Sequence, residues 1–272
     1  SDSSEIVSLI GRSEYKLSDI KGRALVSKDN VYLMQEFLPA DISDAVNYRN
    51  SINEMVAAIT ASHTERAKAI PMLPEKLEFY DLLQRKDNNR GIALGLDNED
   101  VSVRYVDNSG VFLIVGGSGR GKTNALKIVA SQAKTENLFV FDSRSEELYE
   151  YKADLQNRYI NNEENRMDFL NELIYALEKR KNLYEQNNRY VRAKEFYKSL
   201  EPLIICIDDV SRFIAQFQSN EGEVAEVMTM AVNMNAIIFA TTGPNQISGF
   251  GAISKFFKDT QNGLVLGNPS EQ

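Results

Sequence analysis

The chain has 272 residues, of which 43% are hydrophobic and 26% are charged, the composition of a soluble globular protein with a sizeable core. Its net charge of −8 argues against a broad nucleic-acid-binding face, because such faces are usually basic. No apolar run approaches the roughly 20 residues of a membrane helix, and we expect no secretory leader. The single cysteine, Cys206, excludes an internal disulfide, and its apolar neighbours predict a small core residue.

The first 64 residues predict a small N-terminal part made of a hairpin and a linking helix. Residues 23–26 and 31–38 alternate in hydrophobicity around a short polar turn, a pattern typical of a β-hairpin. Residues 41–63 carry apolar side chains at helical spacing, with Asp41 or Ser43 as the candidate N-cap.

Residues 65–272 predict one larger α/β domain. We expect a mostly irregular connection over 68–90, which contains two prolines, and then a second hairpin over 91–96 and 101–106. Beyond it, apolar strands alternate with helices, which implies a mainly parallel sheet with helices on both faces. The expected strands are 111–115, 137–141, 203–207, 236–240 and 263–266, and the expected helices are 124–130, 166–186 and 223–234.

A phosphate-loop motif stands between the first of these strands and the first helix. The stretch GGSGRGKT at 116–123 fits the pattern G-x-x-x-x-G-K-[ST] at every fixed position. Glycines allow successive N–H groups to face a phosphate, and the positive end of the helix favours an anion. Lys122 would reach the β- and γ-phosphates of ATP, and the Thr123 hydroxyl would be a ligand of Mg²⁺. The candidate nucleotide-binding residues are Gly116, Gly117, Ser118, Gly119, Arg120, Gly121, Lys122 and Thr123.

Two carboxylates, Asp208 and Asp209, end the apolar strand 203–207. In phosphate-loop folds this strand lies beside the loop, so Asp208 would hold Mg²⁺ through its water shell, and the next acid would orient the attacking water. An aspartate after an apolar run is also explained by helix capping. Most hydrolysing relatives carry glutamate at the second position, and aspartate is shorter by one C–C bond of about 1.5 Å. That difference is enough to misplace a water molecule.

These elements together resemble the FtsK/SpoIIIE branch of RecA-like motors. The resemblance is carried by the hairpin before the phosphate loop, the Asp208–Asp209 strand, the stretch ATTGP at 240–244 and the stretch ISG at 247–249. Within that branch, the chain is most similar to the C-terminal ATPase module of the type VII secretion motor, the EssC/EccC family in its firmicute form. The terminal stretch 263–272 resembles the last strand and turn of that module.

The resemblance implies a RecA-like fold and a cytoplasmic ATPase module of a membrane-anchored protein secretion motor. Residues 1–64 would be the end of the preceding module, and residues 65–272 would be the ATPase domain. The implied partners are other ATPase modules of the same polypeptide, neighbours in a ring, and small secreted helical-hairpin proteins that carry a C-terminal signal. The membrane would be reached only through the rest of a longer protein, and no nucleic acid is expected.

Departures from the family pattern concern catalysis. DNA-pumping members usually read ATQRP where this chain has ATTGP, so Thr242 and Gly243 replace a sensing glutamine and an arginine. The candidate catalytic residues are therefore Asp208, Asp209 and Thr242, with Thr123 and Asp208 at the metal, and we expect weak hydrolysis. Two alternatives share the fold: a DNA translocase, disfavoured by the acidic charge and the missing arginine, and a non-hydrolysing nucleotide-binding scaffold that recognises cargo.

The helix over 223–234 is a candidate cargo surface as well as a core helix. In the resembling family, the C-terminal module receives the helical export signal, and adaptable methionines suit such recognition. The spacing of Val224, Val227 and Met228 predicts a buried stripe, whereas Met230 and Met234 are expected to lie off it.

Overall fold

The computed structural model describes residues 3–16, 19–37, 44–62, 70–87, 89–143, 145–187 and 191–267. The chain divides into two compact units, residues 1–70 and 71–272, which are described separately below. The boundary expected after residue 64 falls among residues outside the described ranges, so the domain assignment stays a prediction.

The first unit contains the expected hairpin and helix. Strands β1 (Arg23–Ser27) and β2 (Val31–Gln35) pair antiparallel, with Arg23 opposite Gln35, which confirms the hairpin. A short helix, α1 (Ser3–Ile10), precedes them and was not predicted. Helix α2 (Ala45–Ser62) begins after Asp44, whose carboxylate accepts a hydrogen bond from the main-chain N–H of Val46. The candidate N-caps Asp41 and Ser43 lie outside the described residues.

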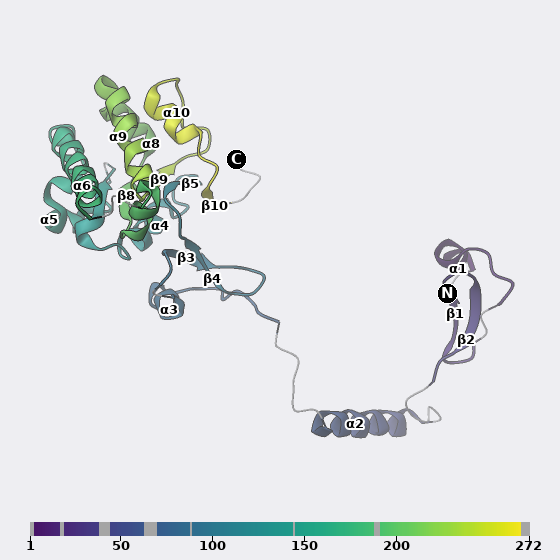
Figure 1. The fold of residues 1–272 in the computed structure, drawn as a ribbon. Coiled ribbons are helices and arrows are strands. Elements are labelled where there is room, and N and C mark those ends of the chain that lie inside the picture. Colours follow the sequence, from purple (N-terminus) through teal and green to yellow (C-terminus); the bar gives the residue numbers. More distant parts are fainter. Residues whose placement is uncertain are drawn as a thin grey trace. The chain divides into compact units, whose positions relative to one another are not determined.

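The second unit is built on a six-stranded parallel sheet with the order β10-β5-β9-β8-β6-β7 (Figure 1). All five neighbouring pairs are parallel, which confirms the sheet type predicted from the alternation of elements. The strands are β5 (Gly110–Gly116), β6 (Leu138–Phe141), β7 (Tyr159–Ile160), β8 (Leu203–Ile207), β9 (Ala236–Thr242) and β10 (Gly263–Leu266).

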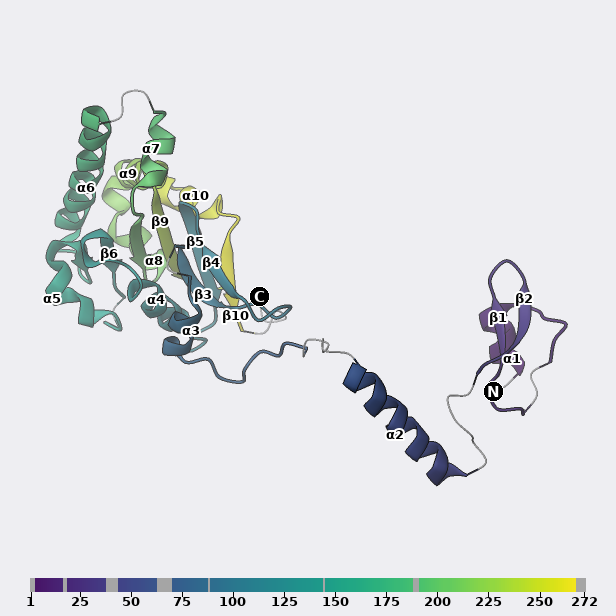
Figure 2. The same cartoon turned by 60° about the horizontal axis from the view of Figure 1, so that its bottom comes forward.

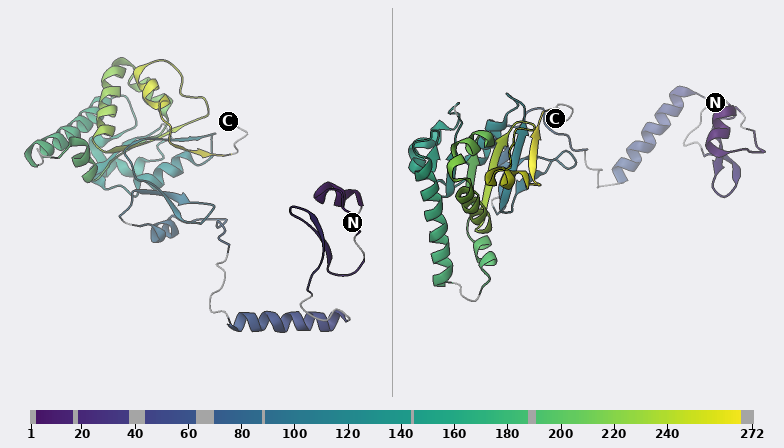
Figure 3. Two further views of the ribbon diagram at one scale, coloured as in Figure 1. Left: turned by 45° about the vertical axis from the view of Figure 1, so that its right-hand side comes forward. Right: turned by 90° about the horizontal axis from the view of Figure 1, so that it is seen from above.

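Helices cover both faces of this sheet, as Figures 2 and 3 show. Phe139 and Phe141 of β6 pack with the side chains of α6, α8, α9 and α10, whereas Leu138 and Val140 pack with those of α4 and α5. Successive side chains of a strand point to opposite faces, so two separate cores form. The helices are α4 (Lys122–Ala130), α5 (Lys152–Leu155), α6 (Arg166–Asn187), α7 (Ala193–Ser199), α8 (Val210–Gln216), α9 (Glu221–Asn233) and α10 (Ala252–Lys258), and 3₁₀ turns span Thr135–Asn137, Tyr149–Tyr151, Gln156–Arg158 and Gln218–Asn220.

Cys206 lies on β8 among the residues that face α4, and it is fully buried. Burial raises the pKa of its thiol, so the side chain stays neutral. The prediction of a small core residue is confirmed.

The second hairpin is present, formed by β3 (Ile92–Leu96) and β4 (Val103–Val106). The Gln132 side chain, just beyond α4, holds it by accepting from the N–H of Ala93 and donating to the Ala93 carbonyl. The expectation of a mostly irregular 68–90 connection is wrong in part, because α3 (Phe79–Arg85) forms there and buries Leu82. The prolines at 71 and 74 precede this helix, so they do not interrupt it. None of the helices in the described ranges is long and apolar enough to cross a bilayer.

Candidate active site

The phosphate loop joins the end of β5 to the start of α4. Gly119 and Gly121 have φ angles of +71° and +89°, which side chains with a Cβ atom rarely adopt. These two glycines let the chain curl back before the first helical hydrogen bond, from the N–H of Ala125 to the Gly121 carbonyl. The first amides of α4 have no partner within the helix, and together with the helix dipole they make this turn suitable for an anion.

The Lys122 side chain folds back over the loop. Its ammonium Nζ donates to the carbonyl oxygens of Gly116 and Gly117, at 2.8 and 2.9 Å. A lysine ammonium has three N–H donors, so one donor remains to bind a ligand oxygen. The loop carbonyls therefore hold the Lys122 ammonium, the cation that the motif predicts, at the edge of the loop.

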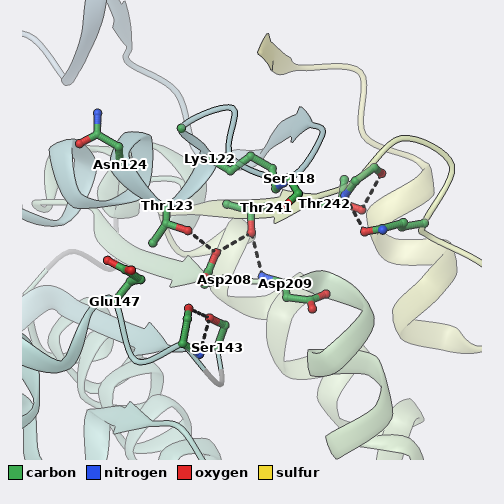
Figure 4. A pocket seen from close by; sticks show the side chains of 15 residues that line it. Ser118, Lys122, Thr123, Asn124, Ser143, Glu147, Asp208, Asp209, Thr241 and Thr242 are labelled. Carbon is green, nitrogen blue, oxygen red and sulfur yellow. Dashed lines mark hydrogen bonds between the residues drawn. The ribbon is translucent and has the colours of Figure 1, made fainter. Parts of the chain in front are cut away.

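Asp208 links the phosphate loop to the two strands in the middle of the sheet. Its Oδ1 accepts from the Thr241 hydroxyl at 2.8 Å and from the Thr123 hydroxyl at 3.4 Å. Figure 4 shows Asp208 between these two threonines. Asp208 is only 5% exposed, so the contacts hold its carboxylate in one orientation at the carboxyl end of β8. Three oxygen-bearing side chains from three separate elements thus meet at one point.

Asp209 points elsewhere and caps α8. Its Oδ1 accepts from the N–H groups of Ser211 and Arg212, at 3.0 and 3.2 Å, which satisfies two of the first amides of the helix. Its own N–H donates to the Thr241 hydroxyl at 2.8 Å, and its φ of +75° is unusual for a residue other than glycine. The sequence left helix capping open for the aspartate directly after the apolar strand, Asp208, whereas in the structure the helix cap is the next residue, Asp209.

The end of β9 supplies Thr242, Gly243 and a glutamine that follows them. Thr242 is 4% exposed, and its hydroxyl donates to the Gly243 carbonyl. The Gln246 side chain returns over Gly243 and accepts from its N–H at 2.8 Å. A Cβ on Gly243 would come within 2.4 Å of the Gln246 amide carbon, so the glycine makes room for this side chain. The side-chain amide of Gln246, four residues after Thr242, therefore reaches the site.

A cavity of about 560 Å³ joins these groups, a size typical of small-molecule sites. Of the candidate residues, Ser118, Gly119, Gly121, Lys122, Thr123, Asp208, Asp209 and Thr242 line it. Gly116, Gly117 and Arg120 are not among the lining residues. Gly116 is the last residue of β5, and the Gly117 carbonyl accepts a hydrogen bond from the Lys122 ammonium. The Arg120 side chain lies against Gly267, which follows β10.

The loop after β6 forms the remaining wall with Ser143, Ser145 and Glu147. Glu147 makes an ion pair with Lys127 of α4, at 2.9 Å. Behind the loop, the buried Asp142 accepts from the Leu148 N–H at 3.0 Å and the Tyr159 hydroxyl at 2.7 Å.

Burial raises the pKa of Asp142, the hydrogen bonds from Tyr159 and Leu148 oppose this shift, and the neighbouring Asp208 charge adds to it. The pKa of Tyr159 is also raised, by burial and by its bond to Asp142. These contacts fix the course of the loop that carries Glu147.

Sequence reasoning did not assign roles to Thr241, Gln246 or Glu147. Thr241 precedes Thr242, which was predicted as a catalytic residue, but no local sequence pattern indicates that the Thr241 hydroxyl would reach Asp208. The other two stand in polar loops whose only signal is their position after an apolar strand, where ligands of open α/β sheets bind.

The donor set fits ATP and Mg²⁺. The loop amides and Lys122 suit phosphate oxygens, and the Thr123 and Asp208 oxygens are ligands of the hard type that Mg²⁺ takes. No group of three or more acidic, histidine or cysteine side chains able to hold a metal occurs in the described part of the chain.

No protein-family model matches the chain. Among characterised proteins, it is 29% identical over 283 residues to the ESX secretion system protein EccC of Geobacillus thermodenitrificans, and 27% identical over 285 residues to the ESX secretion system protein YukB of Bacillus subtilis. Both matches cover 100% of this chain and 19% of the relative. The chain thus spans about a fifth of the length of the relatives it matches.

Solved structures give the same result. The structure of EssC ATPases 2 and 3 from Geobacillus thermodenitrificans matches with a TM-score of 0.63 and 28% identity, over 100% of this chain and 52% of that one. The fold also matches Thermomonospora curvata EccC ATPases 2 and 3, solved in complex with a signal sequence peptide, with a TM-score of 0.51, 17% identity and coverage of 94% and 48%. The homologues of this chain are the EssC/EccC ATPases of type VII secretion systems, and the chain corresponds to a part of them.

Proposed function

We propose that the chain is an ATP·Mg²⁺-binding ATPase module of a membrane-anchored type VII secretion motor. The observation that carries the proposal is the meeting of Thr123, Asp208 and Thr241 beside the phosphate loop, in a chain homologous to secretion ATPases. Lys122 and the loop amides bind the phosphates, and Thr123 and Asp208 hold Mg²⁺. When bound, Mg²⁺ neutralises charge that develops on the phosphates. Nothing in the structure or the relatives favours a DNA translocase.

Within such a motor, we assign residues 65–272 to the C-terminal ATPase module and residues 1–64 to the end of the module before it. The relatives are about five times longer than this chain, so other modules and the membrane anchor belong to the rest of the polypeptide. Neighbouring modules in a ring are the expected source of an arginine finger, which adds about 10³-fold or more to hydrolysis in phosphate-loop enzymes.

The isolated chain is expected to bind ATP·Mg²⁺ but to turn it over slowly. The Thr242 hydroxyl donates to the main chain, and a lone module lacks a neighbour's arginine. Calorimetric affinity for ATP·Mg²⁺, measured beside steady-state phosphate release, tests the proposal. Absence of binding would refute it, whereas rapid release by the monomeric chain would refute the expectation of slow turnover.

We propose that the second ligand is the helical C-terminal signal of a small secreted protein, bound between α9 and α10. A groove of about 750 Å³ lies there, lined by Ala225, Thr229, Met230 and Phe256 and by the acids Glu226 and Asp259. Met230 is 46% exposed, which confirms that it lies off the buried stripe, and Val224, Val227 and Met228 are core residues as expected. The expectation for Met234 is wrong, because it packs against the core beyond the end of α9. The signal peptide seen on Thermomonospora curvata EccC supports the choice of ligand.

Met230→Glu is expected to weaken binding of a synthetic cargo C-terminal peptide by about tenfold or more in a fluorescence titration. The change removes an apolar contact worth about 1.5–3 kcal/mol and adds a charge to an already acidic groove. Met167→Glu, at a methionine of similar exposure on α6, is the matched control and should bind as the unmodified chain does. Equal binding by both variants would move the site away from α9, and no binding by any form would remove the cargo role.

A further inference from the structure

Three carboxylates line the cavity in the described part of the chain: Glu147, Asp208 and Asp209. Asp208 is held by two threonine hydroxyls, and Asp209 is held by two amides of α8. A carboxylate that receives a proton from water in the transition state must face the reacting phosphate, and it cannot be committed to a helix end. Glu147 is the remaining carboxylate, and the contact that the structure shows for it is one ion pair through Oε2.

The ion pair places Glu147 beside the metal-binding turn of α4. Its partner Lys127 stands four residues after Thr123, and residues at this spacing share one face of a helix. Lys127 therefore lies one turn beyond Thr123 and holds Glu147 against the same side of the helix. Figure 4 shows Glu147 on the Thr123 side of Asp208 and Asp209 on the opposite side.

The main chain next to Glu147 is anchored in the core of the domain. Leu148 is fully buried, and its N–H donates to Asp142, which also accepts from Tyr159 on the neighbouring strand β7. Glu147 thus lines the cavity next to a residue that is anchored in the core. An anchored main chain reduces the freedom that the Glu147 carboxylate loses when it orients a water molecule, and phosphoryl transfer depends on such positioning.

We propose that Glu147, and not Asp209, is the catalytic residue that orients and deprotonates the attacking water, an inference that rests on the proposed ATPase function. The water oxygen forms a bond to the γ-phosphorus as the bond to the β,γ-bridging oxygen breaks, and that electron pair leaves with ADP. The water proton passes to the Glu147 carboxylate and then to the released phosphate. The ion pair with Lys127 holds the Glu147 side chain towards α4.

The test compares Glu147→Gln with Asp209→Asn in the full chain. Each change replaces one carboxylate of the same cavity with an amide of the same shape, and asparagine still caps a helix. Two quantities are measured: the single-turnover rate with enzyme in excess of ATP·Mg²⁺, and the affinity for ADP with Mg²⁺ and aluminium fluoride relative to ADP with Mg²⁺ alone. The second reports binding of a transition-state mimic without any turnover.

Glu147→Gln is expected to lower the single-turnover rate by about 100-fold or more, the usual contribution of a general base. It is also expected to remove most of the preference for the aluminium fluoride complex while leaving ATP affinity little changed. Asp209→Asn is expected to lower both quantities far less than Glu147→Gln does. Loss of both quantities in Asp209→Asn with retention in Glu147→Gln overturns the inference.

Equal, small effects in the two variants also overturn it. So does an unmodified chain that binds ATP but shows neither turnover nor preference for the mimic. A chain that does not bind ATP·Mg²⁺ refutes the proposed function itself, and the two failures are thereby told apart.

Discussion

We expect Lys122→Ala to weaken the binding of ATP·Mg²⁺ by about 10- to 100-fold. The ammonium is held over the loop by the Gly116 and Gly117 carbonyls, which leaves one donor for a phosphate oxygen. A hydrogen bond between charged groups contributes about 1.5–3 kcal/mol, and this range corresponds to the expected loss. Isothermal titration of ATP into the two proteins at the same Mg²⁺ concentration measures it.

Lys134→Ala is the matched control for this experiment. Lys134 carries the same charge and forms an exposed ion pair with Glu201, away from the cavity-lining residues. Removing it should leave ATP affinity nearly unchanged, because an exposed pair contributes at most about 1 kcal/mol to stability and touches no ligand. If Lys122→Ala and Lys134→Ala bind ATP as the unmodified chain does, the phosphate-loop assignment is wrong.

Much of the fold could be predicted from the sequence, because long apolar strands and the helices between them are local patterns. β5, β8 and β9 together with α4, α6 and α9 lie close to their predicted ranges. The helices α3, α8 and α10, of seven residues each, were missed. A helix of about two turns shows too few repeats for its period to be read, and such helices depend on tertiary packing more than on propensity. For example, α10 forms where Ile253 and Phe257 are buried against the core.

The candidate site likewise has one part that the local sequence specifies and another part that only the folded sheet brings together. The phosphate loop was predicted in place because eight consecutive residues specify it. The other groups come from the ends of β6, β8 and β9, which are neighbours only in the folded sheet. Nothing near Gln246 in the sequence says that its side chain would fill the space above Gly243, and nothing near Glu147 says that it would pair with Lys127. Such contacts depend on which loops meet at one edge of the sheet.

Asp208→Asn is expected to remove the dependence of ATP affinity on Mg²⁺. Asp208 stands between Thr123 and Thr241, and its negative charge is the feature that we assign to holding the ion through its water shell. The asparagine carbonyl can still accept from both hydroxyls, so the fold and the position of Thr123 should be retained. The loss of a charge-assisted interaction of about 1.5–3 kcal/mol predicts that the gain in ATP affinity on adding Mg²⁺ falls by about tenfold or more.

The measurement is the ratio of ATP dissociation constants in EDTA and in excess Mg²⁺, determined for both proteins. Asp209→Asn serves as the control, because it neutralises a carboxylate of the same cavity whose oxygen is committed to the first amides of α8. Its ratio should match that of the unmodified chain. A ratio near one in Asp209→Asn together with an unchanged ratio in Asp208→Asn would reverse the assignment of the two acids. That result would make Asp209 the metal-site residue. The contact between Asp208 and Thr123 would then serve only to position α4 against the sheet.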